Sequence, residues 1–218
     1  MKHNVYLSQV NHAFGKNVFL PYSIGLLQAY AQTIPEIKSS FEFKELQYLR
    51  ESPVDVVKRL DNPAVFGFSC YIWNWEYNKK LAQLVKLAFP RCLVVMGGPQ
   101  VPTSSDGFFI EHPYADVLVH YEGEHAFAEL LLEYSGDSDY TKIPGLSVKD
   151  YGIAIKTAKR ERLADLSVLP SPYLSGVFDD MPFMQHEFHA SQETSRGCPY
   201  SCTFLRLGFI SISKASII

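Results

Sequence analysis

The chain has 218 residues, carries a formal net charge of −3, and is 47% hydrophobic and 14% aromatic. This composition supports a packed core and excludes a largely disordered chain. The chain contains neither a run of Lys or Arg of the kind that binds nucleic acid nor an apolar run of the roughly 20 residues that span a membrane, so we expect neither partner. The first residues lack the apolar stretch of a secretion signal, which favours a cytoplasmic protein whose four cysteines are thiols or metal ligands.

Strands and helices are predicted to alternate along the first 140 residues. Strands are expected over residues 4–10, 41–48, 64–70, 92–96 and 116–120, and helices after Pro21 and over residues 53–60, 75–88 and 124–134. Ser52-Pro53-Val54-Asp55 has the form of a capping box with proline at the first helical position. Several strands are continuously apolar, as in a parallel sheet that is covered on both faces.

The predicted fold class is therefore α/β, a flavodoxin-like (Rossmann-like) doubly wound five-stranded parallel sheet with helices on both faces. The ligand crevice of such a sheet lies at the carboxyl ends of its strands. The loops expected to form it are residues 9–22, 69–77, 97–106 and 120–125.

The pattern changes after residue 140. Two alternating runs, 146–149 and 153–156, flank Asp150-Tyr151-Gly152 and predict a hairpin. Residues 163–185 contain three prolines and no periodicity, and are interpreted as an extended linker. We divide the chain into a ligand-binding domain over residues 1–140, a hairpin and linker over 141–185, and the start of a further domain over 186–218.

Cys198 and Cys202 form a C-x3-C pair, which on its own is weak evidence for a metal site. The longer run from Thr194 to Phe204 closely resembles the start of the C-x3-C-x2-C motif of radical S-adenosylmethionine (SAM) enzymes, in the branch with an N-terminal cobalamin domain. The resemblance implies that Cys198 and Cys202 are two of the three thiolates that hold a 4Fe-4S cluster, whose fourth iron binds SAM. Residues 186–218 would then contain the first strand of a radical SAM partial barrel.

The third thiolate is missing, because position 205 is leucine and an aliphatic side chain cannot bind iron. Family members commonly continue Cys-Asp-Trp-Gly, whereas this chain has Leu205-Arg206-Leu207-Gly208. An extra thymine after the Phe204 codon would convert TGC GAT TGG GGN into codons for these four residues. We therefore expect a frameshift that removes the barrel, with a divergent family member that uses another ligand as the alternative. The nucleotide sequence around codon 205 would distinguish the two.

Residues 1–140 resemble, more diffusely, the cobalamin-binding domain of the same enzymes. The resemblance is carried by the helix start at Pro21-Tyr22-Ser23-Ile24-Gly25-Leu26, by Gly97-Gly98-Pro99 after a strand, and by Tyr121-Glu122-Gly123-Glu124, where the family often has Gly-Glu-Gly-Glu. Without a Cβ atom, Gly97 and Gly98 would let the corrin or its nucleotide tail approach the backbone. The resemblance implies that the cofactor is bound by Tyr22, Ser69, Gly97, Gly98, Pro99, Glu122, Gly123 and Glu124. For each of them a purely structural role is the alternative.

His12 is a further candidate, as a cobalt ligand. Many cobalamin proteins have Asp-x-His-x-x-Gly after the first strand, but here Val10 stands where the aspartate would orient the imidazole. Radical enzymes of this class also often leave the lower cobalt face without a histidine. We therefore favour His12 as a loop residue that lines the site or faces solvent.

The predicted function is that of a cobalamin-binding portion of a cobalamin-dependent radical SAM enzyme, with methyltransferase-like or related radical chemistry in the intact parent. The 4Fe-4S cluster and SAM would belong to that parent, and this chain should have no radical activity of its own. A non-catalytic flavodoxin-like module, which binds a small molecule or regulates a partner, is the alternative. A zinc site at Cys198 and Cys202 would need two further ligands that the sequence does not supply nearby.

Overall fold

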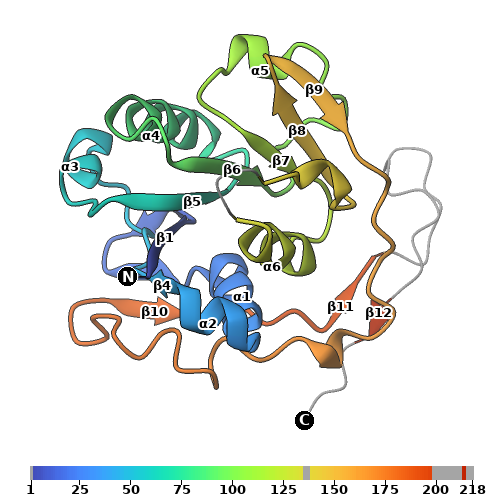
Figure 1. Ribbon diagram of the computed structural model, residues 1–218. Coiled ribbons are helices and arrows are strands. Elements are labelled where there is room, and N and C mark those ends of the chain that lie inside the picture. The colour runs from blue at the N-terminus through green and yellow to red at the C-terminus, as the bar shows by residue number, and fades with distance from the viewer. Residues whose placement is uncertain (1, 135–137, 198–212, 215–218) are drawn as a thin grey trace, which may run out of the picture.

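The computed structural model describes residues 2–134, 138–197 and 213–214, and a seven-stranded sheet forms its centre (Figure 1). The strand order is β4 (Phe41–Phe43), β1 (His3–Ser8), β5 (Pro63–Ser69), β6 (Leu93–Gly97), β7 (Val117–Val119), β8 (Leu146–Asp150) and β9 (Ile153–Lys156). The strands from β4 to β7 are parallel, and β8 and β9 continue the sheet in antiparallel orientation. The predicted doubly wound five-stranded parallel sheet is confirmed, and the predicted hairpin extends it by two strands.

Helices cover both faces of this sheet (Figure 1). On one face lie α1 (Tyr22–Ala31), α2 (Pro35–Ser40) and α6 (Glu124–Leu132), and on the other lie α3 (Pro53–Lys58), α4 (Trp75–Ala88) and α5 (Phe108–Glu111). Successive residues of a strand point to opposite faces, so Val65 of β5 joins the first core and Phe66 joins the second. Burying one such apolar side chain stabilises the fold by roughly 1.5–3 kcal/mol.

The capping box predicted at the start of α3 is wrong. The Ser52 side chain makes no capping hydrogen bond, although its carbonyl accepts hydrogen bonds from the amides of Asp55 and Val56. The Asp55 carboxylate does not reach back to Ser52, because it is held by Lys58 at 3.0 Å. Pro53 does occupy the first turn, as predicted, where its missing N–H costs nothing.

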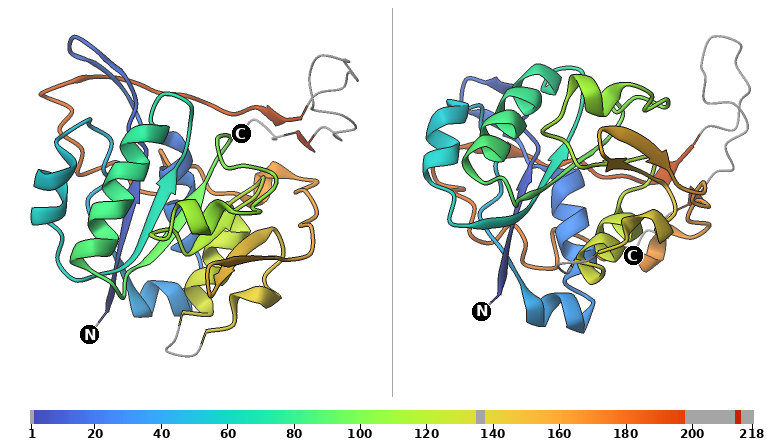
Figure 2. Two further views of the ribbon diagram at one scale, coloured as in Figure 1. Left: turned by 90° about the horizontal axis from the view of Figure 1, so that it is seen from above. Right: turned by 45° about the horizontal axis from the view of Figure 1, so that its top comes forward.

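Residues 157–196 wrap around the α1 face of the domain, although the sequence predicted an extended linker over much of this range. Phe178 is 4% exposed and packs in the same core as α1 and α6. Further along, β10 (Glu187–His189) pairs in parallel with β3 (Asn17–Phe19), which forms a hairpin with β2 (Ala13–Phe14). Figure 2 shows this hairpin and the β10 strand side by side at one edge of the molecule.

Three short elements complete the described chain. They are the 3-10 helices η1 (Tyr140–Lys142) and η2 (Leu166–Val168) and a two-stranded sheet of β11 (Ser195–Arg196) with β12 (Ser213–Lys214). The predicted division at residues 140 and 185 stays a prediction.

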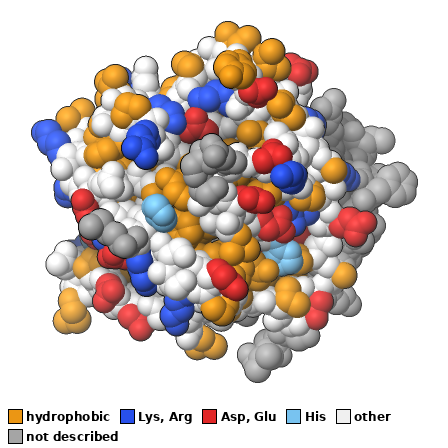
Figure 3. Space-filling model, viewed as in Figure 1, with side chains coloured by type: hydrophobic (Ala, Val, Ile, Leu, Met, Phe, Trp, Pro, Cys, Tyr) orange, Lys and Arg blue, Asp and Glu red, His pale blue; other side chains and the backbone are white. Residues whose placement is uncertain are grey.

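The face in Figure 3 mixes charged and hydrophobic side chains, with Lys and Arg scattered rather than gathered in a stripe. Hydrophobic side chains gather over α5 and β9, where Ile110 and Ile153 are 73% and 68% exposed. In the described part of the chain, no helix is both long and apolar enough to cross a membrane.

Candidate functional site

The candidate site lies at the carboxyl edge of the parallel strands. After β1 the chain moves outward to β4, and it then returns to the other side of β1 to form β5, so the direction of strand addition reverses between β1 and β5. Ligands of open α/β sheets bind in the crevice at this reversal. Ser69, Gly97 and Val119 end their strands in register and form a row along this edge.

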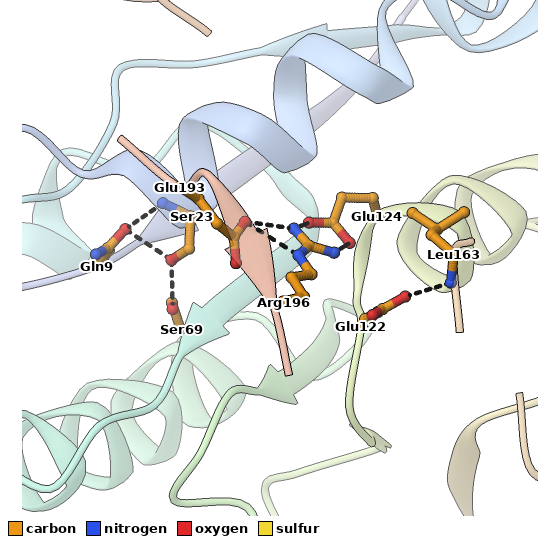
Figure 4. Close-up of polar contacts among 8 residues, drawn as sticks. All are labelled: Gln9, Ser23, Ser69, Glu122, Glu124, Leu163, Glu193 and Arg196. Atoms are coloured by element: carbon orange, nitrogen blue, oxygen red, sulfur yellow. Dashed lines mark hydrogen bonds and ion pairs between the residues drawn. The ribbon is translucent and has the colours of Figure 1, made fainter. Parts of the chain in front are cut away.

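Two hydroxyls and one amide meet at the reversal point (Figure 4). The side-chain oxygen of Gln9, which follows β1, accepts hydrogen bonds from the Ser23 amide at 3.0 Å and the Ser23 hydroxyl at 2.8 Å. The Ser23 and Ser69 hydroxyls lie 2.8 Å apart. Because a hydroxyl has one donor and two acceptor sites, Ser69 retains hydrogen-bonding capacity beyond its contact with Ser23. The sequence singled out Ser69, but Gln9 was missed, since its contact with Ser23 depends on how β1 and α1 meet.

Three glycines predicted to contact the cofactor differ in what their own chain requires of them. Gly98 has φ +103°, and a Cβ there would lie 2.7 Å from the carbonyl oxygen of Cys70. Gly98 is therefore required by the fold itself. Gly97 and Gly123 lack a positive φ, and a Cβ at either would have its nearest neighbours at 3.4 Å or more, which is ordinary contact. Protein packing leaves room for a Cβ atom at Gly97 and Gly123, and the same room is open to a ligand.

The two glutamates of the loop before α6 have protein partners (Figure 4). Glu122 accepts a hydrogen bond from the Leu163 amide at 2.9 Å, while its other carboxylate oxygen is buried without a hydrogen-bond partner among the described residues. Glu124 is 6% exposed and forms an ion pair with Arg196 at 2.6 Å. The carboxylate of Glu124 is thus occupied within the chain.

Tyr22 and Pro99 are two further residues that were predicted to bind the cofactor. Tyr22 begins α1, and its ring packs beside that of Tyr173 with 6.0 Å between centroids. Burial raises the pKa of the Tyr22 phenol, with a further rise from Glu193, so the phenol stays protonated at neutral pH. Pro99 is exposed in the turn after β6.

A buried row of hydrogen-bonded side chains, which the sequence did not predict, starts at His120, directly after β7. His120 is 8% exposed, its Nε2 atom lies 2.8 Å from the Ser147 hydroxyl, and Ser147 accepts a hydrogen bond from Ser105 at 2.9 Å. Burial, and then the nearby Lys156, lower the pKa of His120. The imidazole is therefore neutral at pH 7 and fixes the end of β7 through hydrogen bonds.

The lowered pKa of His120 predicts a pH-dependent stability. The unfolded chain has a His pKa of about 6.5 and gains a proton there, while the buried imidazole resists it, so the free energy of unfolding should fall as the pH drops below that value. Urea unfolding at pH 7.5 and 5.5 measures this fall, and H120Q, which can still bond Ser147, should make it smaller. An equal fall in wild type and H120Q would contradict the assignment.

Comparison with known proteins shows which proteins this chain resembles in sequence and in fold. Residues 39–131 match the B12 binding domain family. Over 200 residues, 89% of the chain, the sequence is 43% identical to 2-(S-pantetheinyl)-carbapenam-3-carboxylate methyltransferase of Streptantibioticus cattleyicolor and to the cobalamin-dependent radical SAM methyltransferase TokK of Streptomyces tokunonensis. This chain contains a B12 binding domain and is similar over most of its length to a cobalamin-dependent radical SAM methyltransferase.

The chain covers only part of the length of these relatives. It spans 29% of each of the two methyltransferases. The fold is also that of the cobalamin-dependent SAM radical enzyme OxsB with aqua-cobalamin and SAM bound, with a TM-score of 0.73 and 20% identity over 99% of this chain and 30% of that one.

The residues that were predicted to bind a metal lie in two different parts of the sequence. His12 is exposed in the loop after β1, and Val10, which takes the place of the orienting aspartate, is fully buried in the core. His12 as a cobalt ligand stays a prediction. Cys198, Cys202 and Leu205 lie outside the described residues, so the incomplete cluster motif and the frameshift also stay predictions.

The other two cysteines are buried thiols, Cys70 and Cys92. Burial raises the pKa of each to about 12, so neither is a thiolate at neutral pH. The described residues hold no group of three or more His, Cys, Asp or Glu side chains placed to bind a metal ion.

Proposed function

We propose that this chain binds cobalamin at the carboxyl edge of its parallel sheet, along the row formed by Ser69, Gly97 and Val119. The observation that carries the proposal is the room at Gly97 and Gly123. Neither backbone dihedral angles nor protein packing demands glycine at these positions, whereas a close-lying planar ligand would. The match to the B12 binding domain identifies the ligand class.

In this proposal each polar group at the edge has a defined task. The Ser69 hydroxyl, oriented by Ser23 and Gln9, donates to Ser23, because the Ser23 hydroxyl donates to Gln9, and it would accept a hydrogen bond from the polar tail of the cofactor. Gly97 and Gly123 would let the cofactor lie against the backbone, and Tyr22 would supply an apolar ring with a protonated hydroxyl. Cobalamin, when bound, supplies a cobalt centre that can carry a methyl group.

The intact parent would combine this site with radical SAM chemistry, as its similarity to the two methyltransferases suggests. In it, Cys198 and Cys202 would supply two of the three thiolates for a 4Fe-4S cluster that binds SAM. Since Leu205 cannot be the third ligand, this chain alone should not perform the radical step.

The direct test is retention of hydroxocobalamin by the purified chain. After gel filtration in the dark, the protein should carry the red cofactor with a shifted corrin spectrum, and S69A should weaken binding by roughly 5- to 10-fold through loss of one hydrogen bond. S167A serves as the control, because Ser167 lies in η2 and is exposed. Retention of flavin mononucleotide but not of cobalamin would favour the alternative flavodoxin-like module.

A further inference from the structure

A buried ion-pair cluster lies between the start of α6 and the chain that leads into the cysteine motif (Figure 4). The Arg196 guanidinium donates to both carboxylate oxygens of Glu124, at 2.6 and 3.2 Å, and to Glu193 at 2.9 and 3.0 Å. The side chains of Arg196 and Glu124 are only 12% and 8% exposed. A bidentate pair at this burial has a fixed geometry, unlike an exposed ion pair.

The cluster is the last of several attachments along residues 187–196. β10 pairs with β3, the Leu20 amide donates to the His189 carbonyl at 3.0 Å, and the Tyr173 hydroxyl donates to the Ser191 carbonyl. The strip runs from β10 to β11 (Figure 2), and the last attachment joins it to α6. Glu124 stands in the first turn of that nine-residue helix, where a carboxylate is favoured by the helix dipole.

We infer that Glu124 is a positioning residue, which holds Arg196 and thereby fixes where the cysteine motif leaves the cobalamin domain. Cys198 follows Arg196 by two residues, and two extended residues span at most about 7 Å. Gly123, which lines the proposed cofactor site, directly precedes Glu124. The ion pair therefore holds Arg196 beside the first turn of α6, two residues before Cys198 in the sequence. The inference rests on the proposed function in treating Cys198 as the start of a cluster motif and Gly123 as part of the cofactor site.

The test is hydrogen–deuterium exchange of the amides in residues 187–197, measured on the whole chain without any cofactor. E124Q removes the charge but keeps the shape, and leaves Arg196 buried with one carboxylate fewer. Exchange within 187–197 should rise by roughly 100-fold, because loss of a buried partner opens the segment it holds. E122Q is the matched control, since Glu122 lies two residues away and contacts Leu163 instead.

A double variant in which the two charges are swapped distinguishes the effect of the ion pair from that of general packing. E124R/R196E keeps one guanidinium and two carboxylates in the cluster, and should bring exchange in 187–197 back to within about 10-fold of wild type. R196K alone should raise the exchange rate of residues 187–197 above that of the wild type, because an ammonium cannot bridge two carboxylates as a planar guanidinium does. If E124Q also accelerates exchange in α4, the domain has unfolded, and E193Q then replaces it, with an increase confined to 187–197.

Two results would overturn the inference. They are unchanged exchange of residues 187–197 in E124Q, and failure of E124R/R196E to slow that exchange. If E124Q keeps the wild-type exchange rate but loses hydroxocobalamin, Glu124 is a cofactor ligand instead. Absence of cobalamin binding in the wild-type chain would refute the proposed function but leave the exchange result intact.

Discussion

Alanine at Gly98 is expected to destabilise the whole domain by about 4 kcal/mol, the sum of backbone strain and overpacking. The φ of +103° is unfavourable for any residue with a side chain, and the added Cβ would lie 2.7 Å from the oxygen and 2.9 Å from the nitrogen of Cys70. Neither backbone is free to move, because the Cys70 amide donates to Gly97 and the Cys70 carbonyl accepts from Gln100. Urea unfolding followed by circular dichroism measures the loss.

The matched controls are G97A and G123A, which should keep the wild-type free energy of unfolding to within about 1 kcal/mol. The added methyl would meet Val119 at 3.4 Å in the first and Leu27 at 3.4 Å in the second. Both variants should weaken cobalamin binding, by roughly 10- to 100-fold, because the methyl occupies the space proposed for the cofactor. Folded G97A and G123A proteins with full affinity would exclude this edge as the contact surface. A G98A protein as stable as wild type would contradict the structural role of Gly98.

The different fates of these glycines show how far the sequence could be interpreted. The motif Gly97-Gly98-Pro99 was correctly placed after a strand, because an apolar run that ends in glycines has few other structures. The motif could not show that the backbone of Cys70, which directly follows β5 and lies 28 residues earlier in the sequence, leaves no room for a Cβ at Gly98. A contact of that kind depends on how β5 and β6 are paired, and local patterns carry no information about it.

The same limit applies to the polar residues of the candidate site. Ser69 was predictable, because it ends a buried strand and the doubly wound topology brings such ends to the ligand crevice. The partner of Glu124 was not predictable, since Arg196 lies 72 residues further along, in the segment that was predicted to start a further domain. Sequence reasoning thus found the edge of the sheet, while the hydrogen-bond partners of the side chains at that edge required the three-dimensional fold.

Alanine at Phe178 is expected to cost about 3–5 kcal/mol, as for other buried aromatic side chains. Phe178 is 4% exposed and belongs to the core of the α1 face. Its ring lies so close to Gly25 of α1 that a Cβ at this glycine would overlap it. Thermal and urea unfolding of F178A would measure the loss.

The control for Phe178 is Leu174 in the same segment, which is 90% exposed. L174A should change the free energy of unfolding by no more than about 0.5 kcal/mol. Equal stabilities for F178A and wild type would mean that this segment is a linker, as its prolines and lack of periodicity predicted. A large loss confined to F178A would mean that the segment is part of the cobalamin domain. The strip from β10 to Arg196 would then begin at a segment that is packed on the domain. The positioning role of Glu124 requires this, because an ion pair at the end of a loosely attached segment could not fix where the chain leads into the cysteine motif.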